Sequence, residues 1–257
     1  MADDVSELRR KVALSCRILA MKGLVRETTG HVSARIPGTA EMFIRGRGNG
    51  ESGLLFTREE DVLRVDFDGS GIPADAPVGN PQELPIHGEI YKARPEAMCV
   101  VHAHPPGALL CGITGVELRP IFLAYDPSAA RFGFDGVPVF PRSMTLTRPE
   151  EVWPMLEVMG EKTYCLMRGH GITVYGRSVE EATVRAIKLE TLARVNWQAA
   201  QRGGAPDVAA EDVALANSRE GRGGHQRDSV QPVWSYYVQL LEQHGGLVDG
   251  PILGIDV

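Results

Sequence analysis

The sequence predicts an α/β fold in which short strands and longer helices pack in layers around one core. The chain has 257 residues, of which 43% are hydrophobic, enough for one domain with a sizeable core. Apolar runs of strand length alternate with stretches in which apolar residues recur at helical spacing. No internal repeat is evident, so residues 1–257 are expected to form a single layered domain.

The first half of the chain combines one helix with several short strands. In order, the pattern predicts a helix at 4–22, a turn and strand within 27–38, strand ends at 42–48 and 53–57, and a strand at 62–71. The helix should end at Gly23, and Asp68-Gly69 is typical of a tight turn after the last strand.

The second half alternates more regularly between the two kinds of element. The pattern predicts a helix at 85–94, a buried strand at 97–104, a helix at 105–113, a strand at 137–141, a helix at 148–159, one bent or two short strands within 164–176, and a long helix at 179–201. Pro95 should stop the first of these helices, and Gly169 and Gly171 allow the bend.

The C-terminal part changes character. Residues 203–228 are rich in glycine, alanine and charge, which predicts a loose segment with one weak helix. A C-terminal helix is expected over 229–244.

Composition excludes several classes of function. The net charge of −6 argues against a nucleic-acid-binding protein, and no apolar run is long enough to span a membrane. The N-terminal residues are charged and do not resemble a secretion signal. The four cysteines are scattered without a CxxC pair, so we expect reduced thiols and a cytoplasmic location.

Three histidines predict a metal site. His102 and His104 end an apolar strand, and side chains two residues apart on a strand project from the same face. His170 lies between two glycines, where the backbone can turn sharply. Three imidazoles suit Zn²⁺, although Mn²⁺, Co²⁺ or Fe²⁺ bind the same set. The spacing alone is equally consistent with histidines that satisfy local hydrogen bonds.

Four segments in order resemble the class II aldolase/adducin family: TTGHVSAR, PQELPIHGEIYKARPEAMCVVHAHPPGA, VPVFPRSMTLT and LMRGHGITVYGRSVEEA. The resemblance covers roughly residues 8–200. It implies an α/β/α sandwich around a mostly antiparallel sheet, one divalent metal ion per subunit, and a homotetramer with active sites between subunits.

The resemblance also assigns roles to residues. His102, His104 and His170 match the three metal ligands of the family, and Glu83 matches its catalytic acid/base. A carboxylate near a cation can hold a proton at one stage and release it at the next. The alternative for Glu83 is a charge at a helix N-terminus.

The chain departs from the sugar-phosphate members at their phosphate site. The asparagine of that site is His31 here, the Thr-Pro-Thr-Gly loop is absent, and the Ser-Ser pair is Pro81-Gln82. Three changes together predict a substrate without phosphate. The family's proton-donating tyrosine aligns with Ala124, so the adjacent Tyr125 is the candidate for that role.

Arginines and aromatic residues suggest a carboxylate substrate instead. Arg168, Arg35 and Arg45 are candidates to pair with carboxylates, whereas Arg47 is expected at the surface. In its RGHGITV motif and in the absence of the phosphate site, the chain resembles a subgroup of decarboxylases in this family that act on hydroxylated aromatic dicarboxylates. Trp234 and Tyr236 could cover a planar ring, or could simply pack the last helix.

Three functions follow, in decreasing order of support. The first is a metal-dependent decarboxylase in which Glu83, His31 or Tyr125 protonates the ring carbon. The second is an aldolase acting on an unphosphorylated hydroxyketone or hydroxyacid. The third is a non-catalytic, adducin-like module, which the presence of all three histidines and the glutamate disfavours.

Overall fold

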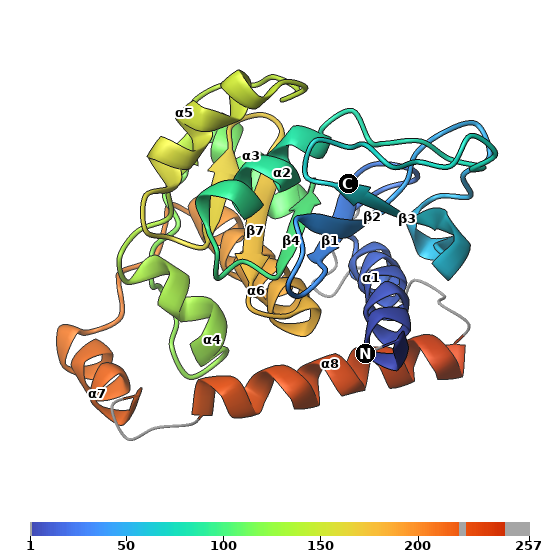
Figure 1. The fold of residues 1–257 in the computed structure, drawn as a ribbon. Helices are drawn as coiled ribbons and strands as arrows, with labels where there is room; N and C mark the ends of the chain where they lie inside the picture. Colours follow the sequence, from blue (N-terminus) through green and yellow to red (C-terminus); the bar gives the residue numbers. More distant parts are fainter. Residues whose placement is uncertain (1, 221–224, 245–257) are drawn as a thin grey trace.

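One seven-stranded sheet organises the molecule (Figure 1). The computed structural model describes residues 2–220 and 225–244. The strands are β1 (His31–Arg35), β2 (Glu41–Arg45), β3 (Val62–Asp66), β4 (Cys99–Ala103), β5 (Val139–Phe140), β6 (Tyr164–Met167) and β7 (Gly171–Gly176), in the spatial order β3-β2-β1-β4-β7-β6-β5. Every neighbouring pair is antiparallel except β5 and β6. The expected mostly antiparallel sheet is confirmed.

Helices cover both faces of this sheet (Figure 1). Their bounds are α1 (Ala2–Met21), α2 (Leu84–Ala93), α3 (Pro106–Thr114), α4 (Pro127–Ala130), α5 (Pro149–Met159), α6 (Val179–Ala200), α7 (Ala210–Glu220) and α8 (His225–His244). One apolar cluster joins α1, α3, α6 and α8 to the sheet, and a second joins α2 and α5 to its other face. These two clusters give the predicted three layers.

Side chains of β4 alternate between the two clusters, which decides where its histidine points. Val101 and Ala103 belong to the cluster under α1 and α6, whereas Val100 belongs to the cluster under α2 and α5. Because residues two apart share a face, His102 projects with Val100 toward α2.

Two expectations for the elements differ from the structure. Residues 53–57 are not a strand end: Leu54–Phe56 is a short 3-10 helix, η1. Gly53 has a φ of 82°, and the Leu54 N–H donates to the Glu27 carbonyl at 3.0 Å, so the chain turns away from the sheet. Within the segment 203–228, α7 is the one helix expected there, but α8 begins at His225 instead of 229, and residues 221–224 lie outside the described part.

The sequence signals for the remaining elements agree with the structure. The stretch 164–176 forms two strands joined by a turn, as one of the two alternatives had it. Cys16, Cys99, Cys111 and Cys165 are all buried free thiols. Among the described residues, no helix is both long and apolar enough to cross a bilayer.

Candidate metal centre and its surroundings

Strand register places three polar side chains in a row on the α2 face of the sheet. His31 on β1 lies opposite His102 on β4, and His102 lies opposite Thr173 on β7. All three are at least 97% buried. The rings of His31 and His102 stack with centroids 5.0 Å apart and 24° between their planes. His102 is therefore held on both sides by its neighbouring strands.

A tight turn between β6 and β7 brings His170 to the same place. Gly169 has a φ of 64°, and the His170 N–H donates to the Met167 carbonyl at 3.0 Å. A side chain at Gly171 would put its Cβ 2.2 Å from the Ala103 carbonyl oxygen and 2.8 Å from the His104 ring. Glycine at this position lets the turn lie directly against the end of β4, so His104 and His170 come together.

Glu83 reaches the cluster from the residue just before α2. Its side chain makes no capping hydrogen bond to the helix, so a role as a simple helix-terminal charge does not describe it. Oε1 accepts a hydrogen bond from the Leu146 N–H at 2.9 Å. Oε2 lies 3.3 Å from Nε2 of His102 and 3.4 Å from Nε2 of His170.

These four side chains form a compact donor set. One ligand atom each from Glu83, His102, His104 and His170 lies within 4.8 Å of all the others, and Nε2 of His102 is 2.9 Å from Nε2 of His104. Imidazole and carboxylate ligands around one point suit a divalent ion such as Zn²⁺.

The hydrogen bonds behind His102 test this fit. The Thr173 hydroxyl donates to Sδ of Met167 at 3.3 Å, so its oxygen must accept the proton of His102 Nδ1, 3.2 Å away. Nε2 of His102 is then a bare electron-pair donor aimed into the cluster. Nδ1 of His170 is also buried and has no hydrogen-bond partner. Both observations are consistent with residues arranged to hold a cation.

Burial controls the protonation of the cluster. Burial lowers the pKa of His102, and it lowers the pKa of His104 to about 3. For Glu83, burial raises the pKa, but the neighbouring imidazoles of His102 and His170 outweigh it and hold the pKa below its usual value. His102 and His104 are therefore neutral imidazoles beside an ionised carboxylate, and these are the forms that bind a metal ion.

A second buried group extends from the cluster under α2. Nδ1 of His31 lies 2.7 Å from Nε2 of His87, Nδ1 of His87 lies 2.6 Å from the Ser33 hydroxyl, and this hydroxyl lies 2.7 Å from the Tyr91 hydroxyl. Sequence reasoning left His87 unassigned and did not connect Ser33. The available signal was the four-residue spacing of Glu83, His87 and Tyr91, which places them along one side of a helix.

The candidate arginines are distributed unevenly around the cluster. Arg35 is four residues from His31 along β1, roughly 13 Å, and its guanidinium donates to the carbonyls of residues 91, 94 and 97. Arg45 is buried and pairs with Glu51. Its side chain lies near Cys16, on the α1 face of the sheet. The structure brings neither of these two arginines to the cluster.

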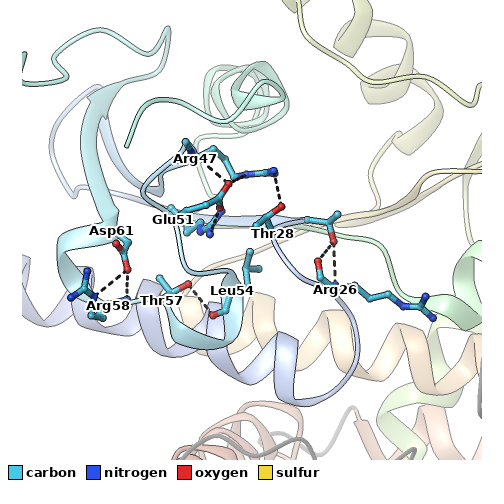
Figure 2. A network of polar contacts seen from close by, with 11 residues as sticks. Arg26, Thr28, Arg47, Glu51, Leu54, Thr57, Arg58 and Asp61 are labelled. Atoms are coloured by element: carbon cyan, nitrogen blue, oxygen red, sulfur yellow. Dashed lines mark hydrogen bonds and ion pairs between the residues drawn. The ribbon is translucent and has the colours of Figure 1, made fainter. Parts of the chain in front are cut away.

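Arg168 lies two residues before His170 in the chain, and Arg47 acts electrostatically on His104. Arg168 is exposed on the β6–β7 turn, and its side chain has no partner among the described residues. Arg47 was expected at the surface, yet its charge contributes to lowering the pKa of His104. Its backbone bonds Gly79 in both directions, and its side chain donates to Glu51 at 2.9 Å and to Thr28 at 3.1 Å (Figure 2).

Within a single copy of the chain, the candidate aromatic residues lie away from the metal-ligand cluster. Trp234 is 5% exposed and packs α8 into the apolar cluster on the α1 face. Tyr236 is 58% exposed and contacts Tyr237. Tyr125 is 64% exposed in the loop before α4, where its ring contacts Phe122.

Comparison with known proteins identifies the family. Residues 10–197 match the family model described as Class II Aldolase and Adducin N-terminal domain. The chain belongs to this family. The resemblance read from the sequence is thereby confirmed, and the Glu83–histidine set occupies the part of the chain that the family model covers.

Two relatives within the class II aldolase and adducin family carry the name of a decarboxylase. The chain is 40% identical over 210 residues to "3,4-dihydroxyphthalate decarboxylase" of Arthrobacter keyseri, covering 80% of this chain and 84% of that protein. It is 41% identical over 209 residues to the protein of the same name from Terrabacter sp. (strain DBF63), covering 80% and 87%. The predicted enzyme class, a carbon–carbon lyase, is confirmed by these relatives.

Solved structures agree on the fold. An aldolase II superfamily protein from Pseudomonas syringae superposes with a TM-score of 0.79 at 23% identity, covering 95% of each chain. At this identity the match supports the fold and says nothing of the substrate.

Proposed function

We propose that this chain is a metal-dependent decarboxylase of a hydroxylated aromatic dicarboxylate, with a dihydroxyphthalate as the first substrate to test. The observation that carries the proposal is the four-residue donor set in a chain about 40% identical to two decarboxylases of that substrate class. The lost phosphate motifs support it, because the substrate offers carboxylates where a sugar phosphate would offer phosphate.

His102, His104 and His170 would hold the ion, with Glu83 beside it. A divalent ion there supplies Lewis-acid stabilisation of the negative charge that develops on the substrate. Zn²⁺ and Mn²⁺ are the ions we propose first, because neutral imidazole and carboxylate ligands accept both.

Glu83 is the residue that moves the proton. Its pKa is held low, so it begins as a carboxylate and can take the proton of a ring hydroxyl on the substrate. Returning that proton to the carboxylated ring carbon gives a ring ketone. The bond to the carboxylate then breaks, CO₂ leaves, its electron pair restores the aromatic ring, and the resulting phenolate takes a proton from water. In the overall reaction, one carboxylate group on the substrate ring is replaced by one hydrogen atom.

His31 and Tyr125 are the other candidates for the proton. His31 lies against His102, whereas Tyr125 is in an exposed loop. A role for Tyr125 would require that loop to fold over the site or to reach the site of another copy of the chain.

Arg168 and Arg47 are the side chains we propose to hold the substrate carboxylates. Arg168 is exposed two residues from His170, and Arg47 is partly exposed and acts on His104. An arginine pairs with a carboxylate through two parallel hydrogen bonds. Arg47 is held in place by Glu51 and Thr28 (Figure 2), so little side-chain entropy would be lost when it binds an anion.

A homo-oligomer, most simply a tetramer, would complete the site. Large apolar side chains are exposed near the β6–β7 turn, including Ile113, which is 56% exposed and close to Gly169. The exposed Tyr236 could then reach the ring of a substrate in a neighbouring copy, while Trp234 anchors its helix. We place the enzyme in the cytoplasm, where its four buried thiols would stay reduced.

Product analysis tests the proposal. The chain, stripped of metal and reloaded with Zn²⁺ or Mn²⁺, should release CO₂ from 3,4-dihydroxyphthalate, and the stripped protein should not. Aldehyde release from an unphosphorylated ketol, without CO₂ from any hydroxylated aromatic acid, would replace decarboxylation by aldol cleavage. A protein that binds neither ion would instead favour the adducin-like module.

A further inference from the structure

The buried group His31, His87, Ser33 and Tyr91 contains three hydrogen bonds in series. The exposed fractions are 3% for His31, 0% for His87 and Ser33, and 1% for Tyr91. Burial lowers the pKa of His87 to about 3, so this imidazole is neutral. Each neutral imidazole carries one N–H, and each link needs one proton.

Three arrangements of protons satisfy all three links. In the first, Tyr91 donates to Ser33, Ser33 donates to Nδ1 of His87, and Nε2 of His87 donates to Nδ1 of His31. In the second, every donor is reversed, so Nδ1 of His31 donates to His87 and Ser33 donates to Tyr91. In the third, the Ser33 oxygen accepts from both Tyr91 and Nδ1 of His87, and the proton of the Ser33 hydroxyl has no acceptor among these side chains.

The hydroxyl of Tyr91, at the end of the series, distinguishes the first two of these arrangements. In the second arrangement the phenol proton of Tyr91 has no acceptor, because Ser33 is the one hydrogen-bond partner of its hydroxyl among the side chains of the described residues. A buried donor without an acceptor is strongly disfavoured. The first arrangement leaves no donor unpaired.

The consequence falls on His31. We propose that Tyr91, Ser33 and His87 are positioning residues that fix His31 in the tautomer with its proton on Nε2, so that His31 presents an N–H donor to an oxygen atom of the ligand at the candidate metal centre. Nε2 of His31 bonds no protein group and is not among the fully buried unpaired atoms, so a ligand can reach it. The identity of that ligand as a hydroxylated aromatic carboxylate rests on the proposed function.

The same series does not serve as a proton wire. A proton passed outward from His31 would have to be replaced from Tyr91, which would leave a phenolate with 1% exposure. Burial raises the pKa of Tyr91 well above its usual value, and no member of the series other than His31 is open to water from which the lost proton could be replaced. The group therefore orients His31, and the moving proton belongs to Glu83.

Solid-state ¹⁵N NMR of the Zn²⁺-loaded, histidine-labelled protein tests the tautomer without any turnover. The His31 signals are assigned by their loss in His31→Asn. We expect a protonated Nε2 and a bare Nδ1 for His31. A protonated Nδ1 would overturn the proposal, whether or not the protein releases CO₂ from any acid.

Two variants test the origin of the tautomer. Tyr91→Phe removes the proton that sets the direction, so His31 should become a mixture of both tautomers, and kcat should fall several-fold in a decarboxylase. Tyr164→Phe is the control, because Tyr164 is a buried tyrosine whose ring contacts Phe132 instead of the series. An unchanged His31 tautomer in Tyr91→Phe would refute the positioning role. If that variant does not fold, the wild-type tautomer still decides.

Discussion

Replacing Thr173 with valine changes one buried hydrogen bond behind the candidate metal centre while keeping nearly the same volume. Thr173 is fully buried, its hydroxyl donates to Met167, and its oxygen accepts from Nδ1 of His102. Valine offers no acceptor. The proton of His102 then gains by moving to Nε2, where it occupies the electron pair that the metal ion needs.

The size of the effect follows from that single lost bond. Removing a partner behind a metal-binding histidine typically weakens metal affinity about 10- to 100-fold, which corresponds to roughly 1.4–2.8 kcal/mol. If His102 keeps its tautomer instead, its Nδ1–H loses the Thr173 oxygen and keeps only the Ile172 carbonyl as acceptor, at a cost of about 0.5–1.5 kcal/mol. In a domain of this size each kcal/mol lowers the melting temperature by about 2–4 °C.

The assay is a competition titration of Zn²⁺ between the protein and a chromogenic chelator, run beside thermal unfolding of the metal-free form. Thr183→Val is the matched control: Thr183 is equally buried, but it bonds Ser15 and the Val179 carbonyl on the other face of the sheet. The control should lose stability and keep its Zn²⁺ affinity. Equal Zn²⁺ affinity for Thr173→Val and wild type would refute the account of His102 given above.

Three further predictions concern the β6–β7 turn, the arginine Arg47 near His104, and the dependence of stability on pH. Gly171→Ala would put a Cβ 2.2 Å from the Ala103 carbonyl oxygen, so we expect a loss of about 1–3 kcal/mol in urea unfolding; wild-type stability would contradict this. Arg47→Met should raise KM for a dicarboxylate about tenfold or more through one lost charge-assisted pair, whereas Arg58→Met, in a 70% exposed side chain, should not. His87 has a pKa lowered from 6.5 to about 3; between these values the unfolded chain binds a proton that the folded chain does not, so stability should fall as pH drops through this range. His87→Gln should flatten that slope in urea titrations, and an unchanged slope would count against the buried neutral imidazole.

Local pattern determined much of the fold. Helical spacing of apolar residues predicted α1, α2, α5 and α6 to within a few residues, because each helix buries one apolar stripe. The apolar run of β4 correctly predicted a buried strand, and the two glycines around His170 correctly predicted a bend. The 3-10 helix after Gly53 was missed, since its cause is a hydrogen bond to Glu27, which lies distant in sequence.

The metal-ligand set was partly visible and partly not. The two-residue spacing of His102 and His104 on a strand and the two glycines around His170 pointed to these histidines, and the family resemblance added Glu83. The different positions of Arg45 and Arg47 could not be predicted from the sequence. Strand alternation directs Arg45 to the α1 face, whereas backbone hydrogen bonds with Gly79 hold Arg47 near His104.

Tertiary structure alone decided how these residues act on one another. Sequence supplied the residue types and the four-residue spacing of Glu83, His87 and Tyr91 along α2. The register between β1, β4 and β7 then set His102 between His31 and Thr173. Hydrogen bonds between residues 54 to 71 positions apart fix tautomers and charge states. Such bonds exist only once the strands and α2 have packed, because no local pattern encodes a partner that lies distant in sequence.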